Sequence, residues 1–168
     1  MATAVKLIDP QHNEFLASLE ARTKQANPFF RAMAHRPDVL KNFPPLYMAI
    51  VGPGSVTRRI KALVYLACSY ANRCPFCIAS NLPGARKAGI TEDEIRALEA
   101  DEDNGFPEPE RAAIRYAREL TRTANAADTR ASLAAHYNDE QIVEITLVAA
   151  LSNFTNRFNN GLGILPNM

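Results

Sequence analysis

The chain has 168 residues, of which 47% are hydrophobic and 22% are charged, with 19 Lys and Arg against 18 Asp and Glu. This composition is typical of a globular domain that can bury a core, and it argues against a disordered or nucleic-acid-binding protein. We therefore expect one domain over residues 1–168 and no nucleic-acid partner.

The lengths of the apolar runs and the first residues of the chain indicate where in the cell the protein is expected. The runs 62–68 and 145–151 are about a third of the roughly 20 apolar residues that a membrane-spanning helix needs. The residues before Asp9 and Pro10 contain no apolar segment of the kind that signal peptides carry. With only three cysteines in addition, the sequence predicts a soluble, cytoplasmic protein with no membrane partner.

The N-terminal third is predicted to consist of helices separated by breaks at proline. A first helix is expected over residues 11–24, and it ends before Asn27-Pro28, where the next segment begins. Two further helices are expected over 29–34 and 37–51. Apolar residues recur at helical spacing in most of the chain, which predicts an all-α fold.

The middle of the chain contains two helices that meet at a cysteine. The first is capped by Ser55 or Thr57 and runs up to Cys74. Cys74 lies at the N-cap of the second, expected over 75–88, because proline is favoured at the first helical position. Gly89 is expected to end that helix.

The C-terminal half shows further helix signals. Residues 91–94 have the pattern of a capping box, and the stretch 101–107 is predicted to be a loop in which the acidic run 101–103 is solvated. The last long helix is expected to begin at Asn138 and to end at Gly161 or Gly163.

The sequence Cys74-Pro75-Phe76-Cys77 is the most informative motif. Two thiols at this spacing can close a disulfide, and the start of a helix favours the thiolate, which attacks peroxides and disulfides. The partner thiol then converts a sulfenic acid into a disulfide. Arg73 can add positive charge. A thioredoxin fold would need a β-strand before the pair, whereas the preceding residues have a helical pattern.

Other interpretations of the reactive residues are simpler. The pair can be two buried small side chains, and a zinc site would need about four ligands, so no metal and no bound cofactor is predicted. Cys68 is expected to be a core thiol. His35 is expected to cap a helix or lie on the surface, and Glu144 and Arg157 to form a structural ion pair or a subunit contact.

Several segments together resemble a known family. They are the helix 58–64 leading into 72–77, followed by 139–144, 156–157 and 162–164. Over about residues 27–164 the chain resembles the carboxymuconolactone decarboxylase or alkylhydroperoxidase D-like family. The resemblance implies an all-helical fold that assembles into homo-oligomers and, in the branch with Cys-x-x-Cys, an antioxidant thiol peroxidase activity.

The resemblance also implies roles for the two cysteines. Cys77 would attack the peroxide, Cys74 would form the disulfide, and an external dithiol would reduce it. The family motif adds a Glu twelve residues before the first cysteine and a His four after the second, where this chain has Ala62 and Asn81. Neither replacement can exchange a proton near neutral pH. Asn81, helped by Ser80, can orient a thiolate or a water without acting as a base, so we expect slower chemistry or another oxidant.

Two alternatives stay open at this point. The chain can be an oligomer that kept the fold and lost catalysis, and that binds a small apolar ligand or senses redox state. It can also be a decarboxylase-like enzyme acting on a lactone, although no acid and base pair for that reaction is evident in the sequence.

Overall fold

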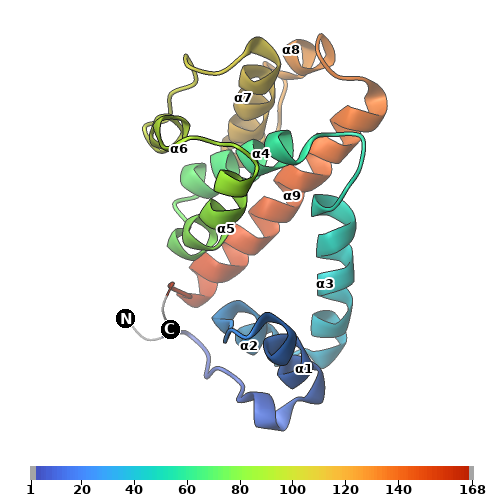
Figure 1. Cartoon of the computed structure of the whole chain (residues 1–168), viewed down its shortest axis with the longest axis vertical. Helices are drawn as coiled ribbons and strands as arrows, with labels where there is room; N and C mark the ends of the chain where they lie inside the picture. Colours follow the sequence, from blue (N-terminus) through green and yellow to red (C-terminus); the bar gives the residue numbers. More distant parts are fainter. Residues whose placement is uncertain (1–2, 167–168) are drawn as a thin grey trace.

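The computed structural model describes residues 3–166, and in that range the chain forms helices and no strand (Figure 1). The elements, in chain order, are the 3₁₀ helix η1 (Pro10–His12), α1 (Glu14–Thr23), α2 (Pro28–Met33), α3 (Pro37–Val51), α4 (Arg58–Ala71), α5 (Pro75–Lys87), α6 (Glu92–Glu99), α7 (Glu108–Thr123), α8 (Arg130–Ala134) and α9 (Asp139–Leu162). The predicted all-α fold is confirmed. No helix within 3–166 is both long enough and apolar enough to span a membrane.

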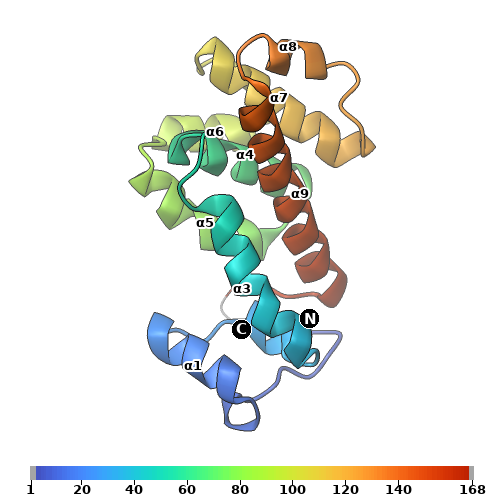
Figure 2. The same cartoon turned by 90° about the vertical axis from the view of Figure 1, so that its right-hand side faces the viewer.

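Helix α4 is the centre of the larger hydrophobic core. It packs against α5, α7 and α9, and Leu63, Val64 and Leu66 on it are completely buried. Burying one such side chain stabilises the fold by about 1.5–3 kcal/mol relative to leaving it in water. In Figures 1 and 2, α9 extends from α7 and α8 at one end of the molecule toward the N-terminal helices at the other.

A second, smaller core holds the N-terminal helices. Its buried members come from α1, α2, α3 and their flanks, together with one residue of α9: Leu16, Leu19, Phe29, Met33, Ala34, Leu40, Phe43 and Leu151. Tyr47 and Ile50 on α3 pack against both cores. Helix α3 therefore links the N-terminal helices to the body built around α4.

Most of the predicted helix ends are found in the structure. Thr57, one of the two proposed caps, accepts a hydrogen bond at the start of α4, and Cys74 is the N-cap of α5. Thr91 and Glu94 form both bonds of the capping box. Gly163 ends α9 with a φ of 67°, a conformation that glycine adopts at little cost.

Three local features differ from the predictions. The expected helix 11–24 begins only at Glu14, because the Asn13 side chain accepts a hydrogen bond from the N–H of Leu16 at 2.9 Å and caps α1 there. The five-residue helix α8 was not predicted. The loop 101–107 is not simply solvated, because Asp103 is largely buried and forms an ion pair of 2.7 Å with Arg115.

A buried ion pair connects α4 to α9. The side chain of Lys61 is only 5% exposed, and its ammonium lies next to the carboxylate of Glu144, which fits the structural ion pair predicted for Glu144. The same ammonium donates to the carbonyls of Ile50 at 3.0 Å and Gly52 at 2.5 Å. Arg157, the other residue of that prediction, instead bonds to neutral groups.

The carboxylate of Glu144 also holds the loop before α4. It accepts hydrogen bonds from the N–H and hydroxyl of Ser55 at 2.7 and 2.6 Å and from the N–H of Val56 at 3.0 Å. A Cβ at Gly54 would collide with the carboxylate, so the loop needs glycine at this position. Burial by itself raises the pKa of Glu144, but the hydrogen bonds from Lys61 and Ser55 outweigh it and the pKa is lowered.

Replacing Glu144 by Gln should lower the free energy of unfolding at neutral pH by about 3–5 kcal/mol, because the Lys61 ammonium stays buried without its charged partner. Since the pKa of Glu144 in the fold is below its ordinary value of 4.5, the stabilisation is complete above that pH and is lost as pH falls through the lowered pKa. Urea unfolding followed by circular dichroism, at neutral and at acidic pH, measures both effects.

Glu99→Gln is the matched control, because Glu99 is exposed. It should change the free energy of unfolding by no more than about 0.5 kcal/mol. The stabilising role of the Lys61–Glu144 ion pair would be contradicted by either of two results. One is a loss of unfolding free energy in Glu144→Gln as small as that in the control, and the other is a loss that stays the same in acid.

Candidate active site

The cysteine pair lies at the junction of α4 and α5. The chain turns sharply there, with a left-handed φ of 49° at Arg73 and a hydrogen bond of 3.0 Å from the N–H of Cys74 to the carbonyl of Ser69. The sulfur of Cys74 then accepts from the N–H of Cys77 at 3.3 Å, as an N-cap side chain does. The two cysteines form a disulfide, with Cα atoms 5.3 Å apart.

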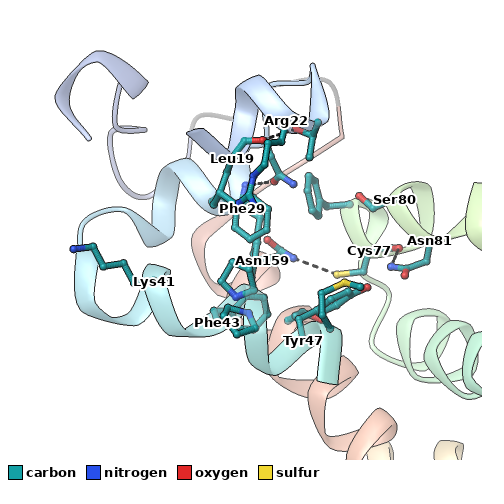
Figure 3. Close-up of a pocket in the computed structure, with 18 of the residues that line it drawn as sticks. Leu19, Arg22, Phe29, Lys41, Phe43, Tyr47, Cys77, Ser80, Asn81 and Asn159 are labelled. Carbon is teal, nitrogen blue, oxygen red and sulfur yellow. Dashed lines mark hydrogen bonds between the residues drawn. The ribbon is translucent and has the colours of Figure 1, made fainter. Parts of the chain in front are cut away.

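The two sulfurs differ in what they face. Both cysteines are buried, but Cys77 lines a pocket with a volume of about 770 Å³, whereas Cys74 is not part of its lining. Figure 3 shows the side chain of Cys77 at one wall of this pocket, opposite Phe29 and Phe43. A molecule in the pocket can therefore reach Cys77 while Cys74 stays behind it.

The pocket lies between the N-terminal helices and the body of the fold. Its lining includes seven aromatic side chains, which are Phe15, Phe29, Phe30, Phe43, Tyr47, Tyr65 and Phe76. Several of these rings contact one another, as Phe29 and Phe43 do at 5.2 Å between ring centroids. Its volume lies in the range of sites that hold drug-sized ligands, so it has room for an organic molecule.

A small set of polar side chains interrupts the aromatic wall near the sulfur. Asn159 on α9 is 1% exposed, and its Nδ2 donates to the Sγ of Cys77 at 3.3 Å (Figure 3). One turn earlier, the hydroxyl of Thr155 bonds to that of Tyr65 at 2.6 Å. Burial raises the pKa of Tyr65, so its hydroxyl is neutral at physiological pH.

Ala62 and Asn81, at the positions where the family motif has Glu and His, do not take the place of that acid and base. The amide of Asn81 donates to the backbone carbonyl of Cys77 at 2.8 Å rather than to its sulfur. Ser80 is exposed and lines the pocket, and Ala62 lines a neighbouring pocket that also reaches Asn81. Asn81 thus reinforces the helix that carries Cys77.

The pocket offers no ordinary proton acceptor. Its lining in the described part of the chain contains no Asp, Glu or His, and its two basic residues are Arg22 and Lys41. In Figure 3, Lys41 points away from Cys77. Within residues 3–166 no three or more side chains of His, Cys, Asp or Glu gather where a metal ion could bind.

Hydrogen bonds between amide side chains fix the turn that leads to Cys74. The Nδ2 of Asn72 donates at 2.9 Å to the side-chain oxygens of Asn153 and Asn156 on α9. Asn156 in turn donates to the hydroxyl of Ser69 at 3.2 Å, and Asn160 donates to the carbonyl of Asn72 at 2.9 Å. The position of the cysteine pair is therefore tied to α9.

Other residues considered in the sequence lie outside the site. Cys68 is completely buried in α4, as predicted, and burial raises its pKa to about 11. His35 contacts the carbonyl of Lys6 at 2.7 Å. Arg73 is exposed and belongs to neither pocket lining.

Sequence reasoning did not identify Tyr65, Thr155 or Asn159 as site residues. Thr155 and Asn159 are four residues apart and therefore share one face of α9. This spacing was a usable signal, but it is equally typical of polar side chains that only stabilise a core. Which group each of them meets depends on the packing of α9.

Comparison with known proteins places the chain in a family. The model of the carboxymuconolactone decarboxylase family matches residues 37–119. The uncharacterized protein YdfG of Bacillus subtilis is 30% identical over 113 residues, which cover 65% of this chain and 77% of YdfG.

Two solved structures have the same fold. An uncharacterized peroxidase-related protein from Silicibacter sp. TM1040 superposes with a TM-score of 0.81 at 19% identity, covering 98% of this chain and 92% of that one. The debrominase Bmp8, as a cysteine-to-alanine variant in complex with 2,3,4-tribromopyrrole, superposes with a TM-score of 0.78 at 22% identity, covering 97% and 91%. The chain described here belongs to the carboxymuconolactone decarboxylase family.

Proposed function

We propose that the protein is a thiol peroxidase in which Cys77 is oxidised by a peroxide and Cys74 then forms the disulfide. One observation carries this proposal: Cys77 lines an open pocket, while Cys74 lies behind it within disulfide reach. The family resemblance supports the same order of events.

The proposed reaction has four steps. The Cys77 thiol first gives its proton to water. The thiolate then attacks the terminal oxygen of a hydroperoxide, the S–O bond forms, the O–O bond breaks, and the leaving alkoxide takes a proton from water. The Cys74 thiol then attacks the sulfenic acid, releasing water and forming the disulfide. An external dithiol supplies the two electrons that reduce it.

Thiolate formation would depend on the helix rather than on a base. Cys77 lies in the first turn of α5, where free N–H groups and the helix dipole favour a negative charge. Because no Asp, Glu or His lines the pocket in the part of the chain described, water must carry the proton. The same lack of an acid and base pair argues against the decarboxylase alternative.

The pocket supports an organic hydroperoxide as the oxidant. Hydrogen peroxide needs only a water-sized space, whereas the volume here is about 770 Å³. Its aromatic walls can bury an apolar group while the peroxide oxygens meet the polar side chains around Cys77.

Adding stoichiometric cumene hydroperoxide to the reduced protein should form the Cys74–Cys77 disulfide at least about tenfold faster than it oxidises a free low-molecular-weight thiol, because more of Cys77 is thiolate. Quenched mass spectrometry follows the disulfide. Cys77→Ser should abolish peroxide consumption, and Cys74→Ser should leave Cys77 carrying one or two added oxygens.

Cys68→Ala is the control, because Cys68 is buried in the core and outside the pocket. It should react as the unmodified protein does. Oxidation no faster than that of the free thiol would remove the peroxidase proposal and favour a protein that binds a ligand or senses redox state through the same pair.

The aromatic lining favours a second candidate, the reductive dehalogenation of an aromatic ring. Two thiols can convert a carbon–bromine bond to a carbon–hydrogen bond, giving a disulfide, bromide and a proton. As in the peroxidase reaction, an external dithiol is needed to reduce the resulting disulfide. The structural neighbour Bmp8 is a debrominase.

Incubating the reduced protein with a tribromopyrrole should then release one bromide per disulfide formed, measured by ion chromatography. Cys77→Ser should lower the release to the uncatalysed rate. A disulfide that forms with cumene hydroperoxide but not with the brominated ring would retain the peroxidase proposal alone.

The homo-oligomer that the resemblance implies stays a prediction. Exposed apolar side chains on α3 and α9 offer a surface for it: Leu46, Met48, Val143, Leu147 and Phe154. Sedimentation velocity should show at least a dimer at micromolar concentration, and Leu147→Glu should shift it toward the monomer. Sedimentation of the unmodified chain as a monomer would contradict the prediction.

A further inference from the structure

Asn159 contains a buried oxygen without a partner. Its Oδ1 and the Nε of Arg111 are the two buried side-chain nitrogen or oxygen atoms within residues 3–166 that make no hydrogen bond. A buried carbonyl oxygen left unpaired lowers stability, so native proteins rarely keep one without a reason. Asn159 is among the residues that line the pocket beside Cys77, so a small movement of its buried side chain would let a donor in the pocket reach this oxygen.

The two ends of the Asn159 amide have different surroundings. Its Nδ2 donates to the Sγ of Cys77 at 3.3 Å, and in Figure 3 its oxygen end points away from the sulfur, on the side of Phe29. An amide at this place can hold a sulfur anion with one end and accept a hydrogen bond with the other. A hydroperoxide brings the matching donor, because its terminal oxygen carries a hydrogen.

We infer that Asn159 is a catalytic residue of this site, whose Nδ2 stabilises the Cys77 thiolate and whose Oδ1 accepts the hydrogen bond of an incoming hydroperoxide. The first role concerns the thiol alone, and the second rests on the proposed peroxidase function. Together they hold the terminal peroxide oxygen at one end of the amide whose other end bonds to the attacking sulfur. The amide exchanges no proton, which is consistent with a pocket that lacks a base.

The hydrogen bond to sulfur should favour the reduced pair over the oxidised one. A thiolate carries a full negative charge and accepts a much stronger hydrogen bond than a disulfide sulfur does. Asn159 therefore lowers the energy of the thiolate more than that of the disulfide seen here. Stabilising the reduced form makes a disulfide easier to reduce.

Because of the unpaired oxygen, replacing Asn159 should lower the reactivity of Cys77 without lowering the stability of the fold. An apolar side chain of similar shape removes the unpaired oxygen and gives up only one bond to sulfur. Asn159→Leu should therefore unfold at the same temperature or higher. Asn156 provides the comparison, because both ends of its buried amide are bonded. Asn156→Leu should melt at a lower temperature.

The first measurement uses the reduced protein and iodoacetamide, without any peroxide. The rate of Cys77 alkylation is followed against pH by peptide mass spectrometry, with buried Cys68 as an internal unreactive thiol. Asn159→Leu should move the pH midpoint of alkylation up by about one unit or more, a tenfold loss of thiolate below the midpoint. Asn159→Asp, which replaces the donor by a carboxylate, should move it further.

Equilibration with dithiothreitol gives an independent readout of the same role. The disulfide of Asn159→Leu should need about threefold to tenfold more reductant for half-reduction at neutral pH. An unchanged alkylation midpoint together with an unchanged reduction equilibrium in both variants would overturn the role of Nδ2.

The role of Oδ1 is tested above the alkylation midpoint of every variant, where Cys77 is fully thiolate. There Asn159→Leu should react with iodoacetamide as the unmodified protein does, and with cumene hydroperoxide about tenfold more slowly. Equal peroxide rates would overturn this role. If the unmodified protein fails to react faster than a free thiol while the midpoint still shifts, the peroxidase function fails and the thiolate role of Asn159 stands.

Discussion

The register between α4 and α9 is the constraint on which the site depends. Buried hydrogen bonds cross this contact, including those from Ser152 to the carbonyl of Tyr65 at 3.1 Å and from Asn156 to Ser69 at 3.2 Å. Sliding one helix past the other by a turn would leave these groups buried without partners, which is costly in an apolar core. The register in turn places Cys77, which follows α4, beside Asn159 on α9.

The chemistry available at Cys77 follows from fixed dipoles rather than from a titrating neighbour. The helix start supplies N–H groups and the Asn159 amide supplies another, and none of these changes charge with pH. Burial also keeps Tyr65 neutral by raising its pKa. Cys77 itself is buried, and in buried surroundings a hydrogen bond to a charged sulfur is stronger than in water.

The pocket exists because the two cores of the fold do not merge. The N-terminal helices pack around Phe29 and Phe43, the body packs around α4, and Tyr47 on α3 contacts both groups. The aromatic rings that stabilise the smaller core also form the wall opposite Cys77. The same side chains therefore support the fold and set the size and polarity of what can approach the sulfur.

The local elements and the reactive pair could be predicted from the order of residues. Helical spacing, the capping box at Thr91, the N-cap position of Cys74 and a stop of the last helix at Gly161 or Gly163 depend on residues close together in the chain. The family resemblance and the loss of the usual proton relay, at Ala62 and Asn81, could be recognised from the order of residues alone.

The surroundings of the pair, in contrast, could not be predicted without the three-dimensional structure. Which cysteine faces the pocket, that Asn81 bonds to a backbone carbonyl, and that Asn159 meets Cys77 all depend on how the helices cross. Lys61 and Glu144 likewise meet although they lie far apart in sequence. The physical reason is that helix periodicity selects which face of a helix is buried, whereas the partner of a side chain on that face is set by the relative position of two helices.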